Sequence, residues 1–506
     1  MIIPAYGPPR SARQRAADNT GEKMSTIQLK LGSRLLFAVA SLAILGACGP
    51  EVAKPAEPVV AAAKPSDAAT WPAAAVADAA TLGFTTEGLA ALDAAMAKSV
   101  ADHDVAGMVT ILGKGGDIAQ FKAYGIQSGD PATGTPMALD SMFRIYSMSK
   151  PITGTAMMQL YEQGKWQLDD PVTKYVPELA SLKVLTWGAD GKPVMKNGKP
   201  VLADPKSPPT MRQLMSHTAG FGYGLCCEDP VNAAFRDTGV LAAPNLDEMM
   251  KRLEAIPLLY DPGTKWSYSA AVDIQGYIVQ KLSGQKFGDY LKEHIFTPLG
   301  MNDTSFFVTD ANKARFTDVY HWDKDTKALV VNPLRPDRPG FDDPNRLESG
   351  GGGLVSTTHD YARFAQMFLG KGTLAGNTVL KPESVELMRT NQIGTLGVST
   401  DGTRPNGLDG VSFGLDFAIY DEPSKTMQPY AKGTHYWGGA AGTWFWIDPA
   451  NDLFFVGMIQ QMGGFRPDGL NFREGSAKLV YAALKSATPA AAPAAAPAEP
   501  AKEPTH

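Results

Sequence analysis

The stretch that decides how this chain is interpreted is FRIYSMSK, residues 143–150. It places Ser147 and Lys150 three residues apart, and the apolar spacing after it predicts a helix over residues 148–163 that stops at Gly164. Residues three apart on a helix share a face, so the amine of Lys150 can reach the hydroxyl of Ser147. A partly buried lysine can remove the proton of a serine and make it a nucleophile. Because Ser and Lys also meet at this spacing by chance, these residues alone favour a helix cap beside a solvated charge.

Four further segments extend outward from this stretch in a fixed order. They are LMSHTAG at 214–220, PGTKWSYS at 262–269, PLGM at 298–301 and WGGAAGT at 437–443. Together with FRIYSMSK they resemble the landmarks of the serine β-lactamase and penicillin-binding-protein superfamily, in particular the class C β-lactamases and their relatives, the family VIII carboxylesterases. The resemblance runs over about residues 83–480. Several ordered landmarks are far more specific than one Ser-x-x-Lys.

The resemblance implies a role for each matching residue. Ser147 matches the nucleophile that becomes acylated, Lys150 is its partner, and Tyr268 passes protons between nucleophile and leaving group. The backbone N–H groups of Ser147 and Ala440 match an oxyanion hole, of which one donor contributes about 10²- to 10³-fold in turnover. Whether Lys150 or Tyr268 is the resting base stays open, because coupled groups titrate as a pair.

Two departures from the lactamase pattern bear on the substrate. The second motif of lactamases is Tyr-x-Asn, but here Ala270 stands where the amide would be. Their Lys-Thr-Gly, on an edge strand that lines the cleft, is replaced by Trp437, Gly438 and Gly439. The missing cation removes a contact worth about 1.5 to 3 kcal/mol to an acidic drug. Both changes resemble the esterase branch and point to uncharged esters and an apolar pocket. Four aromatic residues could contribute to that pocket, although packing is the commoner role for each of them: Phe221, Tyr223, Trp437 and Trp444.

The rest of the pattern predicts an α+β fold. In order, it predicts a helix after Thr85, strands at 108–112 and 118–124, strands at 413–419, 443–447 and 453–459, and a helix at 472–484. Residues 210–385 between them are mostly helical and loop-like in pattern. We therefore expect a β-lactamase-like domain at 81–485. Its antiparallel sheet is formed by the N- and C-terminal segments and flanked by helices, with a mostly helical lobe inserted.

Both ends of the chain lie outside this domain. Residues 1–47 read as a signal region, with Met24 as the true start and an apolar run too short for the about 20 residues that span a bilayer. Cys48 follows Leu-Gly-Ala, which resembles the lipobox of bacterial lipoproteins. Residues 48–80 form an Ala/Pro-rich linker, and residues 486–506 a disordered Ala/Pro-rich tail. We expect an exported, periplasmic lipoprotein anchored in the membrane.

Composition and charge argue against several classes of protein. Lys and Arg total 47 and Asp and Glu 52, for a net charge of −5 and no basic stripe, which argues against nucleic-acid binding. The chain has 3 cysteines and no C-x-x-C pair, so neither a disulfide scaffold nor a zinc site is expected. We interpret Cys226 and Cys227, which are adjacent, as two free thiols. No metal or organic cofactor is implied.

Three other motifs point to chemistry that we do not assign. Gly-x-Ser-x-Gly around Ser412 matches α/β-hydrolases, but a strand pattern follows it where that fold needs a helix. His217 invites a Ser-His-Asp interpretation, but it lies in a landmark that the resembling family uses structurally. The four glycines at 350–353 lack the Gly-Lys-Ser/Thr ending of a phosphate loop, and we expect a turn beside the cleft.

The function that these observations predict is hydrolysis of small carboxylic esters through an acyl-enzyme on Ser147. One alternative is a β-lactamase or D-alanyl-D-alanine peptidase acting on amides of the cell-wall type. Another is a non-catalytic envelope protein that uses the cleft for binding.

Overall fold

The computed structural model describes one of the two units into which the chain divides. The described residues are Trp71, 77–225, 227–332, 339–398, 408–463, 465–466 and 469–485, and all of them belong to the unit that contains Pro65–His506. The other unit, Tyr6–Lys64, lies outside them. The predicted signal region, Cys48, most of the predicted linker and the tail at 486–506 therefore also lie outside the described residues.

One antiparallel sheet joins the two ends of the domain. Its 8 strands run in the order β14-β15-β16-β17-β18-β1-β2-β3. The strands are β1 (Gly107–Lys114), β2 (Asp117–Ser128), β3 (Thr135–Pro136), β14 (Val411–Phe413), β15 (Ala418–Tyr420), β16 (His435–Gly438), β17 (Trp444–Asp448) and β18 (Leu453–Met458). β1 pairs with β18, although more than 300 residues separate them, with Val109 opposite Met458. The predicted α+β fold, with a sheet made by both terminal segments, is confirmed.

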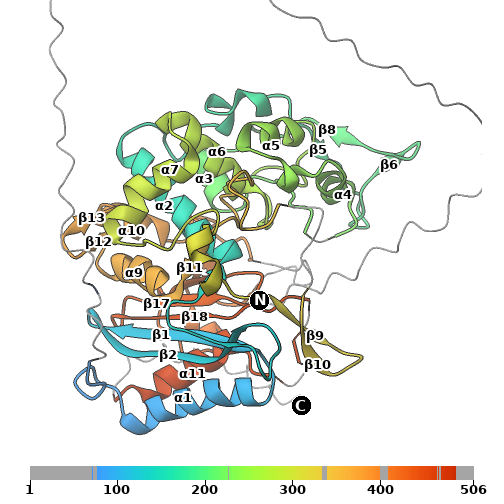
Figure 1. The fold of residues 1–506 in the computed structure, drawn as a ribbon. Coiled ribbons are helices and arrows are strands. Elements are labelled where there is room, and N and C mark those ends of the chain that lie inside the picture. The colour runs from blue at the N-terminus through green and yellow to red at the C-terminus, as the bar shows by residue number, and fades with distance from the viewer. Residues whose placement is uncertain are drawn as a thin grey trace, which may run out of the picture. The chain divides into compact units, whose positions relative to one another are not determined.

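Helices cover both faces of this sheet, because strands such as β17 carry apolar side chains on both faces. Successive side chains of a strand point to opposite faces. Trp444 and Trp446 pack against rings of α11 (Phe472–Ala483), whereas Phe445 lies 5.0 Å from the ring of Tyr361 in α9 (Thr358–Leu369). On the α11 side, α1 (Thr86–Ala101) packs against α11 and β2, and Thr85 caps it by accepting a hydrogen bond from Gly88 N at 3.1 Å. Figure 1 shows α1 and α11 side by side under the sheet.

The inserted lobe is built around a buried helix. Helix α2 (Ser149–Glu162) packs on α6 and α7, and nearly all of its side chains are buried. Pro151 falls in its first turn, where a missing N–H costs nothing. The other helices are α3 (Met211–Met215), α4 (Pro230–Asp237), α5 (Leu246–Leu253), α6 (Ala271–Ser283), α7 (Phe287–Leu291), α8 (Thr297–Leu299) and α10 (Pro382–Met388). In Figure 1 most of these helices lie on the side of the sheet opposite α1 and α11.

The lobe also contains five short two-stranded sheets. They are β4 (Met142–Arg144) with β11 (Val355–Thr357), β5 (Val184–Leu185) with β8 (Leu202–Ala203), β6 (Met195–Lys196) with β7 (Lys199–Pro200), β9 (Tyr320–Asp323) with β10 (Ala328–Val331), and β12 (Thr373–Leu374) with β13 (Asn377–Thr378). β9 to β13 fall within the segment predicted to be mostly helical. Strands of two to four residues are too short to show a period.

Two sequence-based expectations about the sheet were wrong. The alternation at 413–419 predicted one strand, but the chain reverses at Asp416, whose φ is +63°, so β14 and β15 form a hairpin. This hairpin extends the sheet beyond β16, so the strand that carries Trp437 is not an edge strand. β15 pairs only with His435 and Tyr436, however, and therefore leaves the β15-facing edge of Trp437 and Gly438 unpaired.

Among the described residues no helix is both long enough and apolar enough to cross a bilayer.

Candidate active site

The predicted nucleophile lies in a tight turn at the start of α2. A short 3-10 helix, Tyr146–Met148, joins β4 to α2 and places Ser147 partly exposed at the helix N-terminus. Tyr146 takes a φ of +42°, a left-handed conformation that is unusual for a residue with a side chain. The hydroxyl of Tyr361 in α9 donates to Met148 O at 2.9 Å and holds the end of this turn.

The structure brings the three predicted catalytic side chains together. A hydrogen bond of 2.7 Å joins the hydroxyls of Tyr268 and Ser147, which are 121 residues apart. The amine of Lys150 lies 3.4 Å from Ser147 Oγ and 4.6 Å from the centre of the Tyr268 ring. The spatial requirement of the sequence-based hypothesis is therefore met.

Two further groups hold the Lys150 amine. Lys150 is fully buried, and its Nζ donates to Gly351 O at 2.6 Å and to the Tyr223 hydroxyl at 3.2 Å. The sequence predicted Tyr223 only as an aromatic pocket wall and residues 350–353 only as a turn beside the cleft. The four consecutive glycines were the available signal, because a backbone carbonyl can approach a buried amine where no side chains intervene.

A carboxylate that the sequence analysis missed lies behind this amine. Asp273 in α6 is fully buried, and its Oδ1 accepts hydrogen bonds from Gly351 N at 3.2 Å and from the Ser349 hydroxyl. Burial raises the pKa of Asp273, and burial together with the neighbouring Asp273 carboxylate raises the pKa of Tyr223 well above its usual value. A lone acid in the otherwise apolar start of α6 was the signal that could have found it.

Aromatic rings fix the position of Tyr268. Its ring centre lies 5.1 Å from that of His217, 5.4 Å from Tyr223, 5.6 Å from Trp437 and 6.2 Å from Trp266. Trp437 is only 2% exposed, so its indole packs behind the tyrosine and offers little surface to a substrate. The predicted substrate contact of Trp437 is thus replaced by a packing contact.

His217 supports the same tyrosine and is not placed as a base for the serine. Its Nδ1 lies 2.9 Å from the hydroxyl of Ser269, the residue after Tyr268, and its Nε2 has no hydrogen-bond partner among the described residues. Burial lowers the pKa of His217 well below its usual value, so the ring is neutral. The interpretation of His217 as structural agrees with this geometry.

The turn after β16 lies against the backbone that precedes Ser147. A Cβ on Gly439 would lie 2.4 Å from Ile145 O and 2.2 Å from Thr443 Oγ1, so only glycine fits there. The Thr443 hydroxyl donates to Ile145 O at 3.4 Å. The N–H of Ala440, the next residue, has no acceptor within the part of the chain that the structure describes. Residues 438–443 are thus held beside the nucleophile turn.

Other sequence candidates lie elsewhere or differ from expectation. Trp444 faces α11, and its indole N–H donates to Ser476 Oγ at 3.2 Å, on the opposite face of the sheet from α9; the predicted pocket role of Trp444 was therefore wrong. Phe221 is buried in the core. Ser412 is buried within β14, and a strand follows it, so the α/β-hydrolase motif is a chance match.

The two adjacent cysteines were interpreted as free thiols, and for Cys227 this was wrong. Cys227 is disulfide-bonded. Cys226 and Cys48, the other two cysteines of the chain, lie outside the described residues. The expectation failed because backbone spacing argues only against an unstrained bridge.

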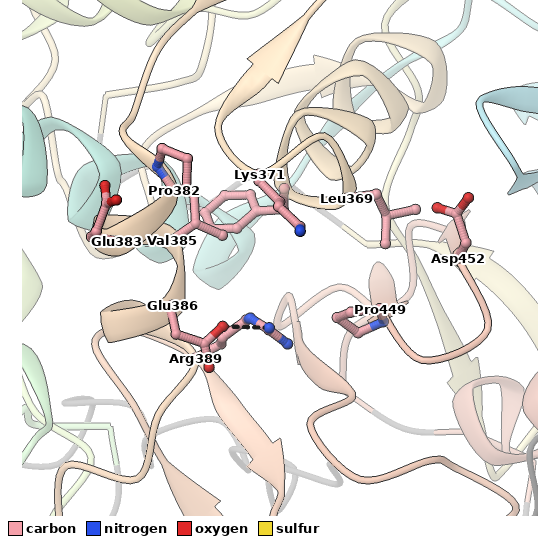
Figure 2. Close-up of a pocket in the computed structure, with 10 residues that line it drawn as sticks. Leu369, Lys371, Pro382, Glu383, Val385, Glu386, Arg389, Pro449 and Asp452 are labelled. Atoms are coloured by element: carbon pink, nitrogen blue, oxygen red, sulfur yellow. Dashed lines mark hydrogen bonds and ion pairs between the residues drawn. The ribbon is translucent and has the colours of Figure 1, made fainter.

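No candidate metal centre lies in the described ranges, and a cavity opens away from this site. No three His, Cys, Asp or Glu side chains converge there to hold a metal ion. A cavity of about 360 Å³ opens between the end of α9, α10 and the β17–β18 turn. Figure 2 shows its charged lining, in which Glu386 and Arg389 form an ion pair. None of the predicted site residues lines it.

We expect Gly351→Ala to disrupt the site. The new Cβ would lie 2.5 Å from Asp273 Oδ2 and 2.6 Å from the Tyr223 hydroxyl, so both groups must move. Overpacking of this kind costs about 1 to 3 kcal/mol of unfolding free energy. Displacement of the Lys150 acceptor lowers the rate of Ser147 labelling by a fluorophosphonate about 10- to 100-fold.

Gly352→Ala is the matched control for this prediction. A Cβ at Gly352 would meet nothing closer than 3.7 Å, and its φ is not left-handed. We expect wild-type labelling and thermal stability for it. Equal labelling rates in the two variants would contradict the role given to the Gly351 carbonyl.

Comparison with known proteins agrees with this geometry. The Beta-lactamase family model matches residues 92–477. Protein Rv1367c of Mycobacterium tuberculosis is 32% identical over 396 residues, which are 76% of this chain and 92% of that protein. Esterase EstB of Burkholderia gladioli is 29% identical over 383 residues, 72% of this chain and 88% of that protein.

Solved structures share the fold. EstCE1, described as a hydrolase with promiscuous acyltransferase activity, superposes with a TM-score of 0.62 at 24% identity, over 79% of this chain and 99% of its own. With the matched family model and the architecture above, this chain belongs to the β-lactamase family, within the serine β-lactamase and penicillin-binding-protein superfamily, and is an enzyme of the hydrolase or acyltransferase type.

Proposed function

We propose that this protein is a serine carboxylesterase that works through an acyl-enzyme on Ser147. The observation that carries the proposal is the 2.7 Å contact between the Tyr268 and Ser147 hydroxyls, with the buried Lys150 amine 3.4 Å from the same oxygen. A serine hydroxyl needs a neighbouring base to become a nucleophile, and this arrangement supplies one.

The reaction follows in two balanced steps. Ser147 Oγ bonds to the ester carbonyl carbon as its proton passes to the Lys150–Tyr268 pair, and the carbonyl oxygen becomes an oxyanion. The N–H groups of Ser147 and Ala440 bind that oxyanion. The C–O bond to the alcohol then breaks, and the alcohol leaves with the proton. Water repeats the sequence on the acyl-enzyme and releases the acid and the free serine.

Two local features favour esters over β-lactams. Ala270, at the position of the lactamase asparagine, is fully buried and presents no polar group to a substrate. No lysine precedes Gly438 in β16, so a drug carboxylate lacks that charged partner. The esterase name of the relative EstB supports the same substrate class.

A comparison of three substrates tests the proposal. We expect kcat/KM for p-nitrophenyl butyrate to exceed that for a chromogenic cephalosporin and a D-Ala-D-Ala peptide at least about tenfold, since each lost charge-assisted contact is worth about 1.5 to 3 kcal/mol. Dominance of the cephalosporin or the peptide would identify a lactamase or peptidase instead. Added alcohols in the same assay measure how far acyl transfer competes with hydrolysis.

We also propose that the enzyme is exported and lipid-anchored through Cys48. The lipobox-like residues before Cys48 support this, and they lie outside the described residues. Mass spectrometry of the mature protein is expected to find an acylated Cys48 at the N-terminus. An unmodified N-terminus at another residue would contradict the anchor.

A further inference from the structure

The role of the buried carboxylate of Asp273 follows from the hydrogen bonds around Lys150. Nζ of Lys150 has three oxygen neighbours: Gly351 O at 2.6 Å, the Tyr223 hydroxyl at 3.2 Å and Ser147 Oγ at 3.4 Å. An ammonium group has three protons and no lone pair, so it matches three acceptors. The carbonyl can only accept, and the direction of the other two contacts depends on where the two hydroxyl protons point.

The charge of Asp273 decides which group donates in the hydrogen bond between Lys150 and Tyr223. Its Oδ2 and the Tyr223 hydroxyl adjoin the same edge of Gly351, at 2.5 and 2.6 Å from the position of an added Cβ. A phenol beside a carboxylate points its proton toward the negative oxygen, so its lone pairs are left to accept from the Lys150 amine. A charged Asp273 therefore requires Lys150 to donate.

The hydrogen bonds of Asp273 favour its charged form. Its Oδ1 accepts from both the Ser349 hydroxyl and Gly351 N, and donors aimed at a carboxylate stabilise the anion. The other acid that interacts with Lys150, Asp416, is equally buried but accepts only one hydrogen bond among the described residues, from Gln275 Nε2 at 3.2 Å. Burial raises the pKa of both acids, and it raises that of Asp416 well above its usual value because fewer donors offset the burial there, so Asp416 is the more easily protonated of the two.

The remaining groups that face Lys150 carry no negative charge of their own. Burial lowers the pKa of His217 and raises that of Tyr223, so both are neutral. Tyr268, whose ring centre is 4.6 Å from Nζ, is the remaining neighbour that contacts Ser147. Asp273 is thus the carboxylate placed to balance the charge of Lys150.

We propose that Asp273 is a positioning residue that holds Lys150 as an ammonium ion and so leaves Tyr268 to take the proton of Ser147. This inference rests on the proposed esterase function. As the Oγ–carbon bond forms and the bond from the carbonyl carbon to the alcohol oxygen breaks, the phenol oxygen of Tyr268 takes the Ser147 proton and gives its own proton to the departing alcohol oxygen. The phenol is neutral before and after this relay, and Lys150 keeps its three protons throughout.

Asp273→Asn tests the proposal, because it removes the charge and keeps the shape. We expect kcat for p-nitrophenyl butyrate to fall about 10- to 100-fold with KM changed less than about threefold. Without the counter-charge the amine loses its proton more readily, so the alkaline limb of the kcat/KM profile moves to lower pH by about one unit or more. Ser349→Ala, which removes one donor to the carboxylate, is expected to move the limb the same way by less.

Asp360→Asn is the matched control. Asp360 in α9 is a buried carboxylate that accepts from Asp303 N and the Thr304 hydroxyl, both at 2.8 Å, away from Lys150. Burial raises the pKa of Asp360 to about 7, so an amide is a mild change there. We expect its kcat for p-nitrophenyl butyrate to lie within about twofold of wild type and the alkaline limb of its kcat/KM profile to stay in place.

The outcomes separate this inference from the proposed function. If a fluorophosphonate does not label wild-type Ser147, the proposed function fails. If it does, but Asp273→Asn leaves the alkaline limb unmoved or moves it to higher pH, only the inference is overturned, whatever happens to kcat. If Asp273→Asn does not fold, Ser349→Ala provides the test. An unchanged alkaline limb of its kcat/KM profile then overturns the inference about Asp273.

Discussion

Ser147→Ala is expected to lower ester turnover by at least about 10⁴-fold and to abolish labelling by a fluorophosphonate. The reason is that Ser147 Oγ is the atom on which the Tyr268 hydroxyl and the Lys150 amine converge, at 2.7 and 3.4 Å. Without it no acyl-enzyme can form, and water alone must attack the ester. Stopped assays with p-nitrophenyl butyrate and gel-based probe labelling measure both effects.

Ser412→Ala is the control for this prediction. Ser412 lies in the Gly-x-Ser-x-Gly motif, but its buried hydroxyl has no partner among the described residues. Its removal should leave turnover and labelling unchanged and stability neutral or improved. A different result is that the wild type itself shows no turnover and no labelling by the probe, with both serine variants the same. That result would favour the alternative function, a non-catalytic protein that uses the cleft for binding. Loss of activity in Ser412→Ala alone would sink the assignment of the nucleophile.

Tyr268→Phe is expected to lower kcat by about 10²- to 10⁴-fold, the usual contribution of a positioned acid–base group. The change removes the hydroxyl that contacts Ser147 and keeps the ring that packs on His217 and Trp437. The fold should therefore persist, and KM should change little. Steady-state kinetics and a melting curve of the same preparation measure the two effects together.

Tyr277→Phe is the matched control for the loss of a tyrosine hydroxyl. Tyr277 in the same region of the chain, within α6, donates to Glu178 Oε1 at 2.7 Å and does not belong to the site. Its substitution should cost about 1 kcal/mol of stability with no effect on kcat. A Tyr268→Phe enzyme with wild-type kcat would show that Lys150 handles the protons without the phenol.

The order of elements and the candidate reacting groups could be predicted from the sequence because both rest on local signals. The helix at Thr86–Ala101 follows from its apolar spacing and its Thr85 cap, and Ser147 and Lys150 share a helix face by their spacing alone. Tyr268 came from an ordered set of motifs. These properties depend on neighbours within a few residues or on the order of the motif segments, and both can be followed along the chain.

The failures arose where the determining contacts are distant in sequence. The hairpin β14–β15 depends on the left-handed Asp416, which fully buries its carboxyl beside Gln275 of α6. The alternation of side chains along β17 is visible in the sequence, but which face of the sheet meets α9 and which meets α11 is decided only when the helices pack. No local pattern carries that choice.

The sequence by itself determined which residues are candidates for the nucleophile, its lysine and its tyrosine, since each residue type suits the proposed chemistry and occupies a fixed place in an ordered motif. Only the tertiary structure decided the electrostatics of that site. The Tyr223 hydroxyl and the Gly351 carbonyl contact Lys150 from segments 73 and 201 residues away, and the Asp273 carboxylate acts on the amine through its charge. A charge is set by the groups that surround it in space, and folding alone brings those groups together in the buried interior.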